Sequence, residues 1–171
     1  MVPEYRNKVD GSAVTSLVSA ETQLHSGNTG IDGFTFSLGH DQAIYSRNGQ
    51  YFLKMQWDGN LVLYRNSGFK ALWSSKTIQP NTGATFEFKI IRGNWMINKN
   101  QSGNITTIWQ SNSGYVPRIE QGLAVPYFVL QNDGNIVMYI SPYPPQGWEA
   151  VIAYRTNTAG GKTSGNYGRL E

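Results

Sequence analysis

The chain carries the same nine-residue pattern twice, and each copy alternates as a β-strand does. Residues 56–64 read Gln-Trp-Asp-Gly-Asn-Leu-Val-Leu-Tyr, and residues 131–139 read Gln-Asn-Asp-Gly-Asn-Ile-Val-Met-Tyr. Both copies fit the pattern Gln-x-Asp-x-Asn-x-Val-x-Tyr. The Asp-Gly pair is typical of a tight hairpin turn, because both residues tolerate positive φ. The alternation that follows places the apolar residues on one face of a strand and Asn, Val and Tyr on the other. We therefore predict internal repeats that are built from β-hairpins.

A degenerate third copy lies between the two intact ones. The segment Leu72-Trp73-Ser74-Ser75 follows the first copy, and Ile108-Trp109-Gln110-Ser111 is a matching segment further along. With a short insertion, the five motif positions of the middle copy fall on Ile90, Arg92, Asn94, Met96 and Asn98, of which only Asn94 keeps its identity. The last repeat ends near Tyr154, which takes the place of the two tryptophans.

These repeats predict one domain over residues 34–158, made of units over 34–80, 81–116 and 117–158. Four short strands in each unit give about twelve strands and almost no helix. Residues 1–33 are interpreted as an N-terminal extension that packs on the domain. Residues 159–171 are predicted to be a flexible tail, with Leu170-Glu171 as a candidate cloning remnant.

The composition fits an all-β domain and argues against several function classes. Charged residues make up 15% of the 171 residues, and 19 residues are glycine, which favours short strands and tight turns over disorder. The net charge is +3, and Lys and Arg are scattered along the chain without the basic stripe that a nucleic-acid-binding protein needs. Cysteine is absent, which excludes disulfides and thiolate metal sites. We see neither a transmembrane run nor a signal-peptide pattern, so membrane insertion is not expected.

The two intact motifs closely resemble those of the bulb-type, monocot mannose-binding lectin family over residues 34–158. The stretch from Tyr45 to Tyr64 is similar to the first repeat of that family almost throughout. The resemblance implies a β-prism II fold, in which three four-stranded antiparallel sheets surround a pseudo-threefold axis. It also implies that Trp73, Trp109 and Tyr154 meet near that axis. The chain is more similar to bacterial or fungal members than to plant members, which usually carry a disulfide and a signal peptide.

The resemblance implies two sugar sites that need no metal and no cofactor. The first comprises Gln56, Asp58, Asn60, Val62 and Tyr64, and the second comprises Gln131, Asp133, Asn135, Val137 and Tyr139. In the family, Asp and Asn hold the axial 2-hydroxyl of mannose, Gln reaches the 3-hydroxyl and Tyr the 4-hydroxyl, while Val faces the C–H groups of the sugar. These roles suit the side chains, because a carboxylate accepts strongly and an amide both donates and accepts.

The middle repeat is not expected to bind a sugar in the same way. Arg92 replaces the acceptor Asp, and Asn98 replaces Tyr. Trp57, beside the first motif, is open to two interpretations: it stacks on an extended glycan, or it is an ordinary exposed strand residue. His25 and His40 lie outside the motifs and have no evident partner.

The sequence is compatible with some functions other than a mannose-binding lectin and argues against others. The chain is also compatible with a lectin-like bacteriocin or adhesin module that binds bacterial rhamnose or mannose polysaccharide, and with a prism-fold interaction protein whose sugar sites are silent. An enzyme is not expected, because Asp58 and Asp133 lie in separate repeats and do not form the close carboxylate pair of a glycosidase. The segment Gly160-Gly161-Lys162-Thr163 lacks the first glycine of a phosphate-binding loop.

The expected partners are mannose and mannose-containing glycans. A homodimer formed by exchange of the C-terminal strand over residues 148–157 is a further hypothesis. The localisation stays open, although action as a secreted or cell-surface protein is favoured.

Overall fold

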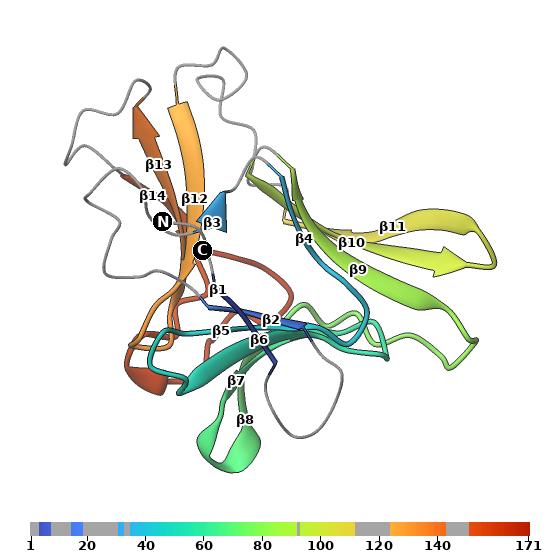
Figure 1. Cartoon of the computed structure of the whole chain (residues 1–171), viewed down its shortest axis with the longest axis horizontal. Coiled ribbons are helices and arrows are strands. Elements are labelled where there is room, and N and C mark those ends of the chain that lie inside the picture. Colours follow the sequence, from blue (N-terminus) through green and yellow to red (C-terminus); the bar gives the residue numbers. More distant parts are fainter. Residues whose placement is uncertain are drawn as a thin grey trace.

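The structure is a computed structural model in which three β-sheets form the sides of a triangular prism (Figure 1). It describes residues 4–7, 15–18, 31–32, 35–91, 93–111, 124–142 and 151–171. The described helical turns are two short 3-10 turns at Ser67–Phe69 and Ala159–Gly161. The predicted all-β fold of three sheets is therefore confirmed.

The first sheet contains the first intact motif and has six strands in the order β1-β2-β5-β6-β7-β8. Their bounds are β1 Glu4–Asn7, β2 Thr15–Val18, β5 Ala43–Tyr45, β6 Tyr51–Met55, β7 Leu61–Arg65 and β8 Lys70–Ser74. This sheet differs from the four-stranded sheet that we expected, because two strands of the N-terminal segment extend it. Strand β2 pairs with β5 in parallel, whereas the other pairs in this sheet are antiparallel.

The other two sheets have four antiparallel strands each. The second has the order β11-β10-β9-β4, with β4 Thr35–Leu38, β9 Thr85–Ile91, β10 Asn94–Gln101 and β11 Asn104–Gln110. The third has the order β14-β13-β12-β3, with β3 Ile31–Asp32, β12 Ala124–Leu130, β13 Ile136–Pro142 and β14 Val151–Arg155. Strands β3 and β4 precede the first motif in sequence but complete the sheets of the later repeats. Strand β14 pairs with β13 of the same chain.

Aromatic side chains fill the space between the sheets. The rings of Trp73 and Trp109 meet edge to face, with their centroids 6.1 Å apart. Tyr154 reaches the same core through Trp95, with the two ring centroids 5.9 Å apart. The three residues that were expected near the axis thus belong to one core, in which Trp95 is an additional member.

The motif hairpins lock the sheets together through their glycines. A Cβ atom on Gly59 would lie 2.8 Å from a ring carbon of Phe86, and one on Gly134 would lie 2.6 Å from a ring carbon of Tyr51. Both glycines also have positive φ, at +86° and +89°. The corresponding turn of the middle repeat contains Gly93, whose carbonyl accepts a hydrogen bond from the hydroxyl of Tyr154 in the last repeat. Each turn therefore packs against an aromatic residue of a neighbouring sheet.

The C-terminal segment 159–171 is held against the core, which differs from the flexible tail that we expected. The indole N–H groups of Trp73 and Trp109 donate to the carbonyls of Arg169 and Gly168, both at 2.8 Å. Leu170 packs on the core, and Glu171 exchanges two backbone hydrogen bonds with Arg155. Indole N–H groups inside a protein usually find acceptors, and this glycine-rich segment supplies them to the buried Trp73 and the partly buried Trp109. Leu170 and Glu171 are thus part of the fold.

Candidate functional site

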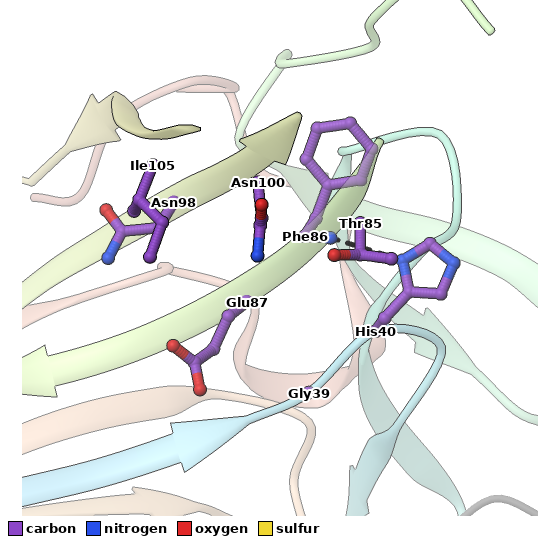
Figure 2. A pocket seen from close by; sticks show the side chains of 8 residues that line it. All are labelled: Gly39, His40, Thr85, Phe86, Glu87, Asn98, Asn100 and Ile105. Carbon is purple, nitrogen blue, oxygen red and sulfur yellow. Dashed lines mark hydrogen bonds between the residues drawn. The ribbon is translucent and has the colours of Figure 1, made fainter. Parts of the chain in front are cut away.

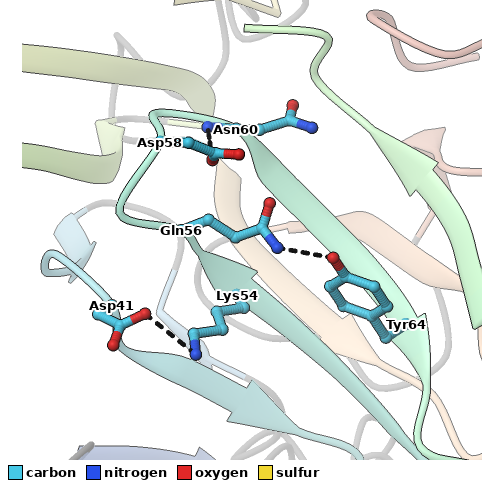
Figure 3. A network of polar contacts seen from close by, with 6 residues as sticks. All are labelled: Asp41, Lys54, Gln56, Asp58, Asn60 and Tyr64. Carbon is cyan, nitrogen blue, oxygen red and sulfur yellow. Dashed lines mark hydrogen bonds and ion pairs between the residues drawn. The ribbon is translucent and has the colours of Figure 1, made fainter. Parts of the chain in front are cut away.

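The first motif forms the turn between β6 and β7 and the strand that follows it. Two backbone hydrogen bonds close the turn, from Gln56 N to the Asn60 carbonyl at 3.0 Å and from Gly59 N to the Gln56 carbonyl at 3.1 Å. The Gln56 side chain donates from Nε2 to the Tyr64 hydroxyl at 2.6 Å. Asp58 Oδ1 accepts from the backbone N–H of Asn60 at 3.0 Å. Figure 3 shows these four polar side chains near one another on the β6–β7 hairpin.

The second motif repeats this geometry between β12 and β13. Gln131 Nε2 donates to the Tyr139 hydroxyl at 2.7 Å, and Asp133 Oδ1 accepts from the backbone N–H of Asn135 at 2.9 Å. The turn is closed by the same two backbone hydrogen bonds, at 2.8 Å and 2.9 Å. The chain therefore holds two equivalent polar clusters, which lie on different sheets.

The motif asparagines are buried and have a structural role. Asn60 is 8% exposed, and its Oδ1 accepts from Ser75 Oγ and from the backbone N–H of Thr77, both at 3.2 Å. Asn135 is 7% exposed, and its Oδ1 accepts from Thr158 N at 3.0 Å and from Thr156 Oγ1 at 3.3 Å. Among the described residues, neither Nδ2 group makes a hydrogen bond. Each asparagine thus anchors the next strand through its oxygen, and its NH2 group bonds to no described residue.

The same anchor explains why Asn94 survives in the middle repeat. Ser111 Oγ donates to Asn94 Oδ1 at 3.1 Å and accepts from the backbone N–H of Trp95 at 3.0 Å. Ser75 does the same in the first repeat, where it accepts from the N–H of Leu61 at 3.0 Å. The position of Arg92 lies outside the described residues. Asparagine at this position is therefore required by the fold in all three repeats.

The motif valines offer little surface to a ligand. Val62 and Val137 are 3% and 1% exposed, although we expected them to face the C–H groups of a sugar. Larger apolar side chains are exposed close to the first motif instead. Trp57 is 60% exposed, and Ile78 is 67% exposed beside Gln79, whose N–H donates to the Asp58 carbonyl at 2.8 Å. The motif pattern does not predict that Ile78 lies near the site, because the contact with the Asp58 turn is made by the backbone of Gln79.

The surroundings of the two clusters differ in charge. In the first, Lys54 lies opposite Val62 and forms an ion pair with Asp41 at 3.0 Å (Figure 3). In the second, the residue opposite Val137 is the buried Val129. Sequence reasoning missed Asp41, which reaches the site from the loop before β5. The first cluster thus has charged neighbours at a place where the second has an apolar one.

The described residues contain neither a candidate metal cluster nor a candidate membrane-spanning helix. No group of three or more His, Asp or Glu side chains there could hold a metal ion. No helix in the described part is long and apolar enough to cross a membrane.

Comparison with known proteins shows what the fold is similar to. No protein-family model and no curated protein sequence matches the chain. Among solved structures, it is similar to a lectin of Marasmius oreades, with a TM-score of 0.50 and 22% identity over 75% of this chain and 93% of that one. It also matches the Polygonatum cyrtonema lectin in complex with monomannoside, with a TM-score of 0.46 and 28% identity over 66% of this chain and 87% of that one. The mannose-specific agglutinin of snowdrop (Galanthus nivalis) matches at a TM-score of 0.45 and 25% identity, over 61% and 83% of the two chains.

The arrangement of three sheets and the Marasmius oreades comparison define the fold as the β-prism II of lectins. The resemblance to bulb-type lectins, first seen in the motifs, is confirmed at the level of the fold.

Proposed function

We propose that this chain is a non-enzymatic lectin that binds mannose-type residues through its two motif clusters. The observation that supports this function is the repetition of one hydrogen-bonded arrangement at two separate hairpins. A fold that needed only the strands would not have to retain Gln, Asp and Tyr at both places. The middle repeat keeps its hairpin without these three residues.

The first cluster illustrates how a pyranose would bind. One oxygen of Asp58 accepts from the backbone, and the other can accept from a sugar hydroxyl in a charge-assisted hydrogen bond. The NH2 group of Asn60 can donate to the oxygen of the same hydroxyl. Because Gln56 donates its amide hydrogen to Tyr64, the Tyr64 hydroxyl keeps its own proton for a ligand, and Gln56 keeps its carbonyl oxygen.

Selectivity for mannose would come from its axial 2-hydroxyl. Glucose carries this group equatorially and would leave the Asp and Asn groups imperfectly paired. An unsatisfied polar partner costs about 1–3 kcal/mol, which corresponds to about 5-fold to 150-fold in affinity. The affinity for one sugar ring should be near millimolar, about −4 kcal/mol. Two sites on one chain would then raise the avidity for branched glycans.

Calorimetric titration with methyl α-mannoside and its 2-epimer, methyl α-glucoside, tests this proposal. We expect mannoside-selective binding whose motif-site stoichiometry is halved by Asp58→Ala and falls to zero when Asp133→Ala is added. Asn81→Ala removes an exposed polar side chain outside the motifs and should bind as the unmodified protein does. A prism-fold protein whose sugar sites are silent would give no heat of binding with either sugar and no signal on a glycan array. That result would refute the proposal.

A further inference from the structure

A pocket of about 260 Å³ opens on the second sheet, away from both motif clusters. It lies between the turn that carries Gly39 and His40 and the strands β9, β10 and β11 (Figure 2). Pockets for drug-sized ligands usually span about 300–1,000 Å³. The size of this pocket therefore suits a ligand no larger than one sugar ring.

The pocket is lined by side chains that can donate hydrogen bonds and whose acceptor atoms each already take one hydrogen bond. Asn98 Oδ1 accepts from Thr107 Oγ1 at 2.8 Å, and Asn100 Oδ1 accepts from the backbone N–H of Gly103 at 2.9 Å. Both amides line the pocket, and neither NH2 group makes a hydrogen bond to a described residue. His40 Nδ1 accepts from the backbone N–H of Phe86 at 3.2 Å, so the neutral ring carries its proton on Nε2 and can donate from there.

The remaining lining adds one acceptor and an apolar wall. Glu87 lines the pocket, and its side chain is 42% exposed, so its carboxylate is accessible to a ligand hydroxyl although it lies 3.5 Å from the ammonium group of Lys89. Ile105 is 66% exposed on the neighbouring strand. Amide donors, one carboxylate and an aliphatic surface match the hydroxyl and C–H groups of a neutral pyranose. An anionic ligand fits less well, because Glu87 would repel it.

Phe86 is a lining residue of the pocket that also contacts the turn of the first motif. This residue lines the pocket, and its ring packs against Gly59 in the Asp58-Gly59 turn. Phe86 is thus a buried residue shared by the pocket wall and the packing of the first motif's turn.

We propose that this pocket is a third saccharide site, which binds one neutral hexopyranose through Asn98, Asn100 and Glu87. These residues do not belong to either intact motif, and two of them lie beyond the motif positions of the middle repeat. The choice of a sugar as the ligand rests on the proposed lectin function, whereas the arrangement of donors and acceptor does not.

Side-chain NH2 resonances in NMR spectra can test the pocket and the motifs separately. The probes are methyl α-mannoside, methyl α-glucoside, methyl β-galactoside and N-acetylglucosamine, each titrated into the Asp58→Ala/Asp133→Ala protein. We expect saturable shifts of the Asn98 and Asn100 NH2 signals with at least one probe. Glu87→Gln replaces the charged acceptor with a neutral one and should weaken this binding roughly tenfold. Asn100→Ala should weaken it as well, and Lys76→Ala, an exposed control, should leave it unchanged.

The proposal is overturned if none of the four sugars shifts the pocket signals, or if the shifts persist unaltered in both Glu87→Gln and Asn100→Ala. In the unmodified protein, the Gln56 and Gln131 NH2 signals report on the motif sites during the same titrations. Shifts of those signals alone would refute the pocket and leave the lectin function intact. Shifts of the pocket signals alone would refute the motif sites and support the pocket.

Discussion

Replacement of Asn60 by alanine should destabilise the protein far more than replacement of Gln56, although both residues belong to the motif. Asn60 Oδ1 accepts two hydrogen bonds, from the Ser75 hydroxyl and the Thr77 backbone N–H, at a position that is almost fully buried. A hydrogen bond contributes about 0.5–1.5 kcal/mol net, and a buried donor left without a partner costs about 1–3 kcal/mol. Asn60→Ala should therefore lower the free energy of unfolding by about 2–4 kcal/mol.

Gln56→Ala is the matched control, because it removes a carboxamide from a half-buried position. The one side-chain bond of Gln56 in the described structure goes to the Tyr64 hydroxyl, which water can replace. The expected loss is below about 1 kcal/mol. Urea unfolding followed by tryptophan fluorescence measures both variants, and Asn135→Ala should repeat the Asn60 result through Thr156 and Thr158. Equal losses for Asn60→Ala and Gln56→Ala would refute the structural role of the asparagine.

Two further predictions concern the packing of the turns and of the C-terminal segment. Gly59→Ala and Gly134→Ala should each cost about 1–3 kcal/mol more in urea unfolding than Gly103→Ala, because all three have positive φ but only the first two would press a methyl group into an aromatic ring; equal costs would refute the packing. Removal of residues 168–171 should lower the free energy of unfolding by about 2–5 kcal/mol, because the indole N–H groups of the buried Trp73 and the partly buried Trp109 lose their acceptors. Arg169→Ala keeps the carbonyl and should change thermal unfolding little, whereas an unchanged melting temperature after truncation would show that the segment is dispensable.

Much of the fold could be predicted from the sequence because hairpin turns and strand alternation are local signals. The Asp-Gly turns at residues 58–59 and 133–134 form the hairpins that they predict. The outer strands could not be assigned in this way. Strands β3 and β4 are short, and their partners β12 and β9 lie far along the chain. The position of a short edge strand depends on which sheet edge is left unpaired after the other strands have packed. The residues of the short strand do not encode that position.

The C-terminal segment and the surroundings of the motifs escaped prediction for a related reason. The composition of residues 159–171 favours flexibility, yet two backbone carbonyls of this segment accept hydrogen bonds from Trp73 and Trp109. Because every residue has a carbonyl, the sequence does not indicate which ones make such contacts. The Asp41–Lys54 ion pair and the exposed Ile78 also join the first motif from outside its pattern. The spacing of residues in the sequence identifies side chains that lie on the same hairpin. It does not identify residues of other loops that come close to the hairpin only in the folded chain.

The middle repeat separates what the fold requires from what a ligand requires. Its Asn94 keeps the anchor to Ser111, so retention of asparagine in all three repeats follows from stability alone. The motif valines are also buried and pack within the sheet. Gln, Asp and Tyr then remain as the identities that are kept in two repeats and lost in the third, where the hairpin still forms. Because stability accounts for the asparagine and burial for the valine, the argument for a ligand rests on Gln56, Asp58 and Tyr64 and on their three equivalents in the last repeat.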